Sequence, residues 1–110
     1  MQIVSSQITI HEIDGAFSLT FYCGDLPADE AIVETGHEPN GYFWEGMVQY
    51  LAPEIAEQLE LDSEGGMFAA NGERPALDAL QSLIEPYLGD GEKVATVIRE
   101  AEDSGFAFDD

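Results

Sequence analysis

Hydrophobic and polar residues alternate in two stretches near the start of the chain, at residues 2–13 and 16–23. Both stretches are rich in β-branched and aromatic residues, and Asp14 and Gly15 lie between them. In the second stretch every other residue from 17 to 21 is apolar, which places the apolar side chains on one face of a strand. The pattern predicts a β-hairpin closed by a two-residue turn.

Helical spacing replaces this alternation from residue 42 onward. Apolar residues recur every three or four positions and form one stripe: Trp44, Met47, Val48, Leu51, Ile55 and Leu59. Asn40 or Gly41 offers an N-cap to this helix, which we expect to begin near Tyr42. Pro53 lacks an amide hydrogen and clashes with the preceding turn, so it should kink the helix or divide it into two.

A second hairpin is predicted after this helix. Residues 59–62 and 67–70 have strand-like composition and flank the sequence Ser63-Glu64-Gly65-Gly66. Glycine adopts positive φ angles without a steric penalty, so we expect Gly65 and Gly66 to supply them in the turn.

Two more helices are predicted in the last third of the chain. Residues 77–88 keep helical spacing with Pro75 in the first turn, and residues 94–101 keep it between a capping Asp90 and a terminating Gly105. The predicted order is therefore ββαββαα. It indicates an α+β fold, in which a small antiparallel four-stranded sheet made of two hairpins carries helices packed on one face. We expect residues 1–110 to form a single domain.

The segment between the first hairpin and the long helix, residues 24–39, is named here the acidic connector. Its carboxylates are Asp25, Asp29, Glu30, Glu34 and Glu38. We expect only Ile32 and Val33 to pack, at most one short helical turn, and a solvated loop otherwise.

Net charge narrows the classes of partner. The 110 residues include 23 acidic and three basic ones, which gives a formal net charge of −20, and no Lys or Arg precedes Arg74. With 45% hydrophobic residues the chain is too apolar for a disordered acidic tail. Such a surface repels nucleic acid and anionic membranes and attracts basic proteins. The alternative is an acidic adaptor or structural domain of a salt-adapted cell, whose charge serves solubility alone.

Catalytic and metal chemistry find little support. Cys23 is the only cysteine, so no internal disulfide forms, and neither His11 nor His37 belongs to a motif with a nucleophile or to a metal-ligand spacing. We expect a buried thiol, a solvated His37, no cofactor, no metal and no enzyme activity. A hydrolase that uses a chance pair of carboxylates is the weakest alternative. The start of the chain lacks a basic region and a long apolar region, so we expect a cytoplasmic protein without a membrane span.

Phe43 and Tyr50 are seven residues apart and should project together from the edge of the apolar stripe, near Glu54 and Glu57. They either cover the sheet edge or the connector, or form an aromatic anchor ringed by acidic groups. The second interpretation joins them to the connector in one candidate partner-binding surface: Asp25, Asp29, Glu30, Glu34, Glu38, Phe43 and Tyr50.

Two segments are distinctive, NGYFWEGMVQYL at residues 40–51 and LDSEGGMFAA at residues 61–70. Together they resemble the immunity protein 51 family of bacterial polymorphic toxin systems. The order of the predicted elements agrees over most of the chain, but the recognisable sequence similarity is confined to these two segments. The matching positions, which we interpret as chiefly structural, are Gly41, Tyr42, Trp44, Glu45, Gly66, Met67 and Phe68.

The resemblance implies a protein that is made beside a toxin and protects the producing cell and its kin by binding that toxin. Combined with the charge, it predicts a cognate basic toxin, such as a nuclease, as the partner. The protein would neutralise the toxin in the cytoplasm by occluding its active site or by binding beside it.

Overall fold

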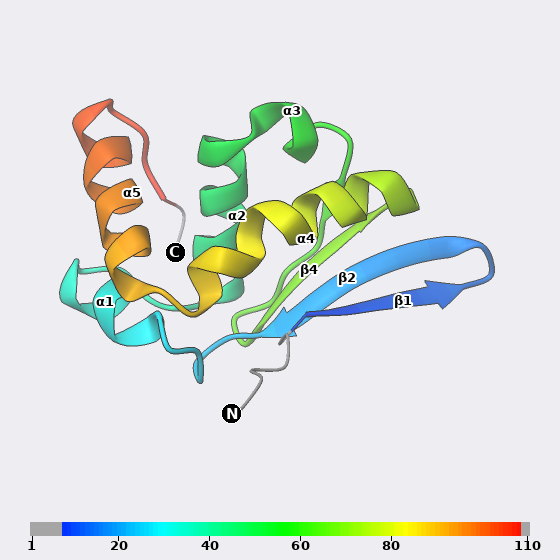
Figure 1. The fold of residues 1–110 in the computed structure, drawn as a ribbon, viewed down its shortest axis with the longest axis horizontal. Helices are drawn as coiled ribbons and strands as arrows, with labels where there is room; N and C mark the ends of the chain where they lie inside the picture. Colours follow the sequence, from blue (N-terminus) through cyan, green and yellow to red (C-terminus); the bar gives the residue numbers. More distant parts are fainter. Residues whose placement is uncertain (1–7, 109–110) are drawn as a thin grey trace.

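The computed structural model of the chain describes residues 8–108 and has helices packed over one β-sheet (Figure 1). The strands of the described part are β1 (Thr9–Ile13), β2 (Ala16–Tyr22), β3 (Glu60–Leu61) and β4 (Met67–Gly72). Its helices are α1 (Asp29–Glu34), α2 (Gly41–Leu51), α3 (Pro53–Ala56), α4 (Arg74–Leu88) and α5 (Gly91–Asp103).

The α+β class and the four-stranded antiparallel sheet are confirmed. The element order over residues 8–108 is ββαααββαα and differs from the predicted ββαββαα for two local reasons. The connector folds into α1, and the predicted long helix divides at Pro53, which begins α3. Asn40 caps the start of α2, because its side-chain oxygen accepts a 2.8 Å hydrogen bond from the Phe43 amide.

Neighbouring strands of the sheet run antiparallel in the spatial order β1-β2-β4-β3. In the turn between β1 and β2, φ is 54° at Asp14 and 83° at Gly15. Two consecutive positive φ angles are typical of a type I′ turn, whose twist matches that of the strands it joins. The first hairpin is therefore confirmed where it is described; residues 2–7 of the predicted first strand lie outside the described residues.

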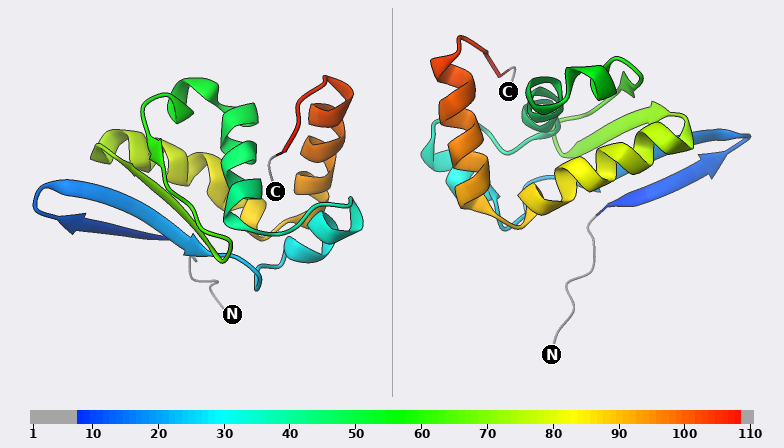
Figure 2. Two further views of the ribbon diagram at one scale, coloured as in Figure 1. Left: turned by 180° about the vertical axis from the view of Figure 1, so that it is seen from behind. Right: turned by 45° about the horizontal axis from the view of Figure 1, so that its top comes forward.

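A hydrophobic core fills the space between the sheet and the helices. On the sheet, Phe21 lies opposite Phe68 and Leu19 opposite Ala70, and all four side chains are buried. The rings of Phe21 and Phe68 stack at 4.9 Å, and Trp44 from α2 meets Phe21 edge-on at 5.7 Å. Helices α2 and α4 lie across this face of the sheet in both figures (Figures 1 and 2).

Helices α1 and α5 lie beyond one end of the sheet and pack against each other (Figure 2). The two helices approach closely, because a Cβ atom placed on Gly91 would lie 2.9 Å from the Cβ of Ala31. The expectation that the helices pack on one face of the sheet therefore holds for α2 and α4 and is wrong for α1 and α5.

The turn of the second hairpin is held by side chains. The Ser63 hydroxyl accepts a 3.0 Å hydrogen bond from the Ala69 amide, and the Ser63 amide donates to Glu45 of α2 at 2.9 Å. Gly65 and Gly66 are not among the residues with positive φ, so the expectation that they supply such angles is wrong.

Candidate functional site

The acidic connector is ordered by an apolar face of its own. Leu26, Ala28 and Ile32 are buried in the core, and the Ala28 amide donates a 3.3 Å hydrogen bond to the carbonyl of Leu88. The expectation of a solvated loop with only two packing residues is therefore wrong. Ile32 is the buried residue of α1, which packs against α5, whereas Glu30 and Glu34 of the same helix are exposed.

The connector carboxylates have two different environments. Asp25, Glu30, Glu34 and Glu38 are exposed, whereas Asp29 is half-buried. One oxygen of Asp29 accepts a 3.1 Å hydrogen bond from the Leu26 amide, and its other oxygen is buried without a hydrogen-bond partner. Burial raises the pKa of Asp29, and the nearby charge of Asp25 raises it further. Asp29 therefore links the start of α1 to the preceding loop by a hydrogen bond, and the other four side chains face solvent.

We expect Asp29→Asn to stabilise the protein at neutral pH. A carboxyl whose pKa is raised by folding favours the folded state when it is protonated, and this contribution is lost as the pH rises through its folded pKa. The asparagine oxygen can still accept the bond from Leu26 without the cost of a half-buried charge. Urea melts at pH 7 should show a higher midpoint, and the gain should disappear near pH 3.

Glu30→Gln is the matched control for this prediction. It removes the same formal charge from the same helix, but the Glu30 side chain is exposed. A gain at pH 7 no larger than that of Glu30→Gln would show that burial of Asp29 carries no cost.

The aromatic pair of the predicted surface is covered by the end of the chain. Phe43 is fully buried and its ring stacks on Phe108 at 5.0 Å, while Tyr50 is half-buried and lies 5.4 Å from the ring of Phe106. The prediction that Phe43 and Tyr50 project from the helix edge as an anchor is therefore wrong. Neither sequence interpretation considered the C-terminal segment as their cover.

Two sequence features point to this aromatic cover, and both were missed. Phe106 and Phe108 alternate after the end of α5, and Gly46 interrupts the large side chains of α2. A Cβ atom on Gly46 would lie 2.8 Å from the Phe108 ring, so the glycine leaves room for that ring. His37 packs edge-on against Phe108 at 5.1 Å and lies 2.7 Å from a carboxylate oxygen of Glu102, so it is not the solvated histidine expected.

Exposed apolar side chains gather around the connector instead. Among residues 8–108, the large hydrophobic side chains that face solvent are Tyr22 at 75%, Val33 at 58% and Tyr42 at 42% exposure. Tyr22 precedes the connector, Val33 lies on α1 and Tyr42 follows in the first turn of α2. The end of β2, the start of α2 and α1 lie toward the same end of the molecule (Figures 1 and 2).

The turn of the second hairpin joins the two tyrosine-bearing segments. The Cys23 amide donates to the Gly66 carbonyl at 2.9 Å, and the Gly41 amide donates to the Gly65 carbonyl at 3.2 Å. Tyr22 and Tyr42 are the chain neighbours of these donors, so they flank one turn. Met67 pairs with Tyr22 across the sheet.

The positions of the family resemblance are thereby brought together. Trp44 and Phe68 are buried, Glu45 binds the Ser63 amide, and Gly41 packs directly on the turn. These contacts belong to the core and to the turn of the second hairpin. Tyr42 differs from the rest because its side chain is exposed.

Cys23, the cysteine of the chain, is half-buried. Burial raises the pKa of the Cys23 thiol to about 11, which keeps the thiol protonated at neutral pH. Within residues 8–108, no three His, Cys, Asp or Glu side chains are grouped as metal ligands would be. No helix in that range is long and apolar enough to cross a membrane.

Comparisons with other proteins add no further constraint. No protein-family model, no curated protein and no solved structure matches the chain. The resemblance to the immunity protein 51 family therefore stays a prediction that rests on residues 40–51 and 61–70.

Proposed function

We propose that this protein is an immunity protein that binds a basic bacterial toxin in the cytoplasm and neutralises it by occlusion, without catalysis. The partner follows from the charge. With 23 acidic residues and three Lys or Arg, at least 23 − 3 = 20 carboxylates have no such residue to neutralise them. A basic protein surface, such as the nucleic-acid-binding site of a nuclease, is the complementary partner.

The observation that carries the proposal is the coincidence of exposed apolar and acidic side chains at the connector. We name this set the recognition surface. Its members are Tyr22, Asp25, Glu30, Val33, Glu34, Glu38 and Tyr42. Buried aromatic anchors within a polar rim are where binding energy concentrates in protein interfaces. Tyr22 and Tyr42 therefore replace the buried Phe43 and the half-buried Tyr50 as the proposed anchors.

Charge and anchors have separate roles in this mechanism. Exposed carboxylates attract the basic partner before contact and accelerate association, an effect that salt screens. The tyrosines lose water only after contact, so they slow dissociation. A partner whose active site binds phosphates would be blocked by the same carboxylates that attract it.

We expect the association rate to fall steeply with salt, from about 10⁸ M⁻¹s⁻¹ at low salt toward about 10⁵–10⁶ M⁻¹s⁻¹ when charges are screened. Glu30→Lys combined with Glu34→Lys should slow association by at least about tenfold at low salt, because the reversed charges face the approaching partner. Stopped-flow mixing with the protein encoded beside this chain's gene, which should be basic, measures both effects.

The matched control reverses two exposed carboxylates elsewhere, Glu85→Lys with Glu100→Lys on α4 and α5. It changes the net charge equally and should slow association less. Equal effects of the two pairs would contradict the recognition surface. An association rate that does not change with salt would leave the charge as a solubility device of a salt-adapted cell.

A further inference from the structure

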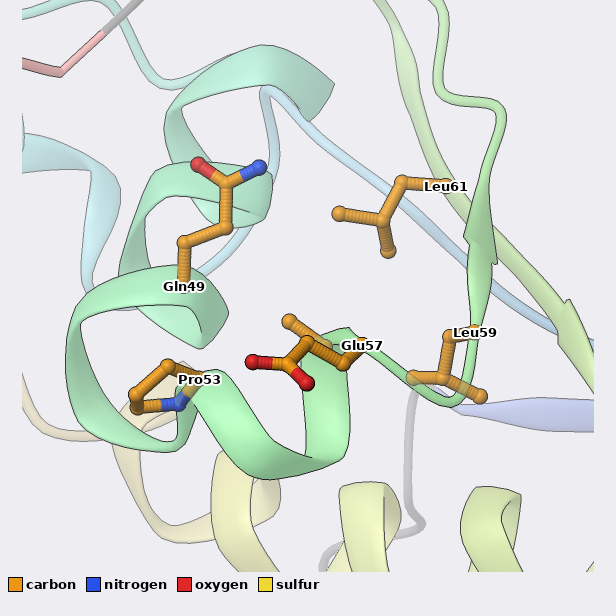
Figure 3. A pocket seen from close by; sticks show the side chains of 6 residues that line it. Gln49, Pro53, Glu57, Leu59 and Leu61 are labelled. Carbon is orange, nitrogen blue, oxygen red and sulfur yellow. The ribbon is translucent and has the colours of Figure 1, made fainter.

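A groove separates α3 from the edge strand β3 (Figure 3). Its volume is about 420 Å³, and its lining residues come from α2, α3 and β3 or directly adjoin these elements: Gln49, Pro53, Ala56, Glu57, Leu59 and Leu61. Pro53 and Leu59 face each other across it, with the Glu57 carboxylate between them in the view of Figure 3. The groove is thus apolar on its walls and carries one charged group.

The polar groups of the groove are available to a ligand. Glu57 is exposed and, among residues 8–108, has no hydrogen bond or ion pair with another side chain. Gln49 adds an exposed amide on the other side. Leu59 and Leu61 are half-buried because part of each side chain packs on the core, and the rest borders the groove.

The charges around the groove are of one sign. Residues 45–62 contain five carboxylates and no Lys or Arg. An anionic ligand is therefore repelled, and a cation is attracted. The volume lies at the lower end of the range for small-molecule sites, which suits one long side chain better than a cofactor.

We propose that this groove takes an arginine side chain of the basic partner, an inference that rests on the proposed function. The aliphatic stem would lie along Leu59 and Leu61, as long charged side chains do on apolar surfaces. The planar guanidinium would donate two hydrogen bonds to the Glu57 carboxylate. Gln49 of α2 would border the bound side chain.

The groove is continuous with the recognition surface along α2. Tyr42 and Gln49 are exposed and seven residues apart, so they lie on one side of the helix about 10 Å from each other. Glu45 lies between them and joins the helix to the second hairpin through the Ser63 amide. One partner surface can therefore contact Tyr42 and place an arginine in the groove.

The test uses the whole protein and the peptide acetyl-Gly-Arg-Gly-amide, with citrulline in place of arginine as the uncharged control. Amide chemical shifts should move in a saturable way at Gln49, Glu57, Leu59 and Leu61 with the arginine peptide only. Glu57→Gln should weaken this binding by about tenfold, because a charge-assisted pair is lost. Glu54→Gln removes the same charge from α3 outside the groove and should leave binding unchanged.

Shifts that spread over the acidic segments without saturation, equal binding of the citrulline peptide, or unchanged binding by Glu57→Gln would each overturn the inference. These failures are distinct from failure of the proposed function. If Glu57→Gln and the parent neutralise the toxin equally, the groove is not part of the interface and the proposed function stands. If the peptide binds as expected but no basic partner is neutralised, the groove stands and the proposed function fails.

Discussion

Trp44→Ala is expected to lower the free energy of unfolding by about 3–5 kcal/mol, a large part of the roughly 5–15 kcal/mol that holds a domain of this size folded. Trp44 is fully buried, and its ring meets the rings of Phe21 at 5.7 Å and Phe43 at 5.4 Å. Removing it leaves a cavity between α2 and the sheet, because the alanine side chain is too small to fill the space. Urea melts of the variant and the parent measure the loss.

Tyr42→Ala is the control for this measurement. Tyr42 lies two residues earlier on the same helix, but 42% of its side chain is exposed. Its replacement should move the urea midpoint much less. Equal losses of unfolding free energy for the two variants would show that Trp44 is exposed and does not belong to the core.

Gly41→Ala is expected to destabilise the protein by about 1–3 kcal/mol or more, as overpacking of a closed contact does. A Cβ atom on Gly41 would overlap the carbonyl oxygen of Glu64 and lie 2.5 Å from that of Met67. Both neighbours are backbone atoms of the hairpin turn, so neither can rotate away. Alanine favours a helix over glycine by about 1 kcal/mol, a gain too small to offset this overlap.

Gly65→Ala supplies the comparison for Gly41. Gly65 lies in the same contact, but a Cβ atom there would meet nothing within 4 Å and its φ is not positive. Thermal melts should therefore show a large loss for Gly41→Ala and little change for Gly65→Ala. The reverse order would show that α2 and the turn do not touch as described.

The local features of the fold are predictable from the sequence because they depend on neighbouring residues. Asp14 and Gly15 specify a hairpin turn, Asn40 and Asp90 cap helices, and Pro53 divides one. Each of these follows from the backbone preference or hydrogen-bonding capacity of a single residue type.

Contacts between distant segments are not predictable in this way. Phe43 and Tyr50 have the spacing of an exposed pair, but Phe108 stacks on Phe43 and Phe106 lies against Tyr50. Periodicity on one helix cannot show which other segment covers its edge. Gly46 is the one local sign of the contact between α2 and Phe108, because a larger residue there would collide with the Phe108 ring.

The candidate site could be predicted only in part, because some of its features depend on single residues and others on contacts between distant segments. The exposure of Asp25, Glu30 and Glu34 follows from their charge, since an unpaired carboxylate is costly to bury. Asp29 is half-buried instead, because its position at the start of α1 lets its carboxylate accept a hydrogen bond from the Leu26 amide. The proposed anchors, Tyr22 and Tyr42, could not be predicted in this way, because the second hairpin brings their segments to one turn.

The growth of cells provides a test of the proposed neutralisation of a basic toxin by this acidic protein. Cells would express the protein encoded beside this chain's gene, which should be basic, alone or together with the parent chain or its Glu30→Lys, Glu34→Lys variant. Growth should stop with the basic protein alone. The parent chain should restore growth and co-purify with the basic protein, and the folded variant should restore growth less. A basic neighbour that does not arrest growth, or arrest that the parent chain leaves unchanged, would contradict it.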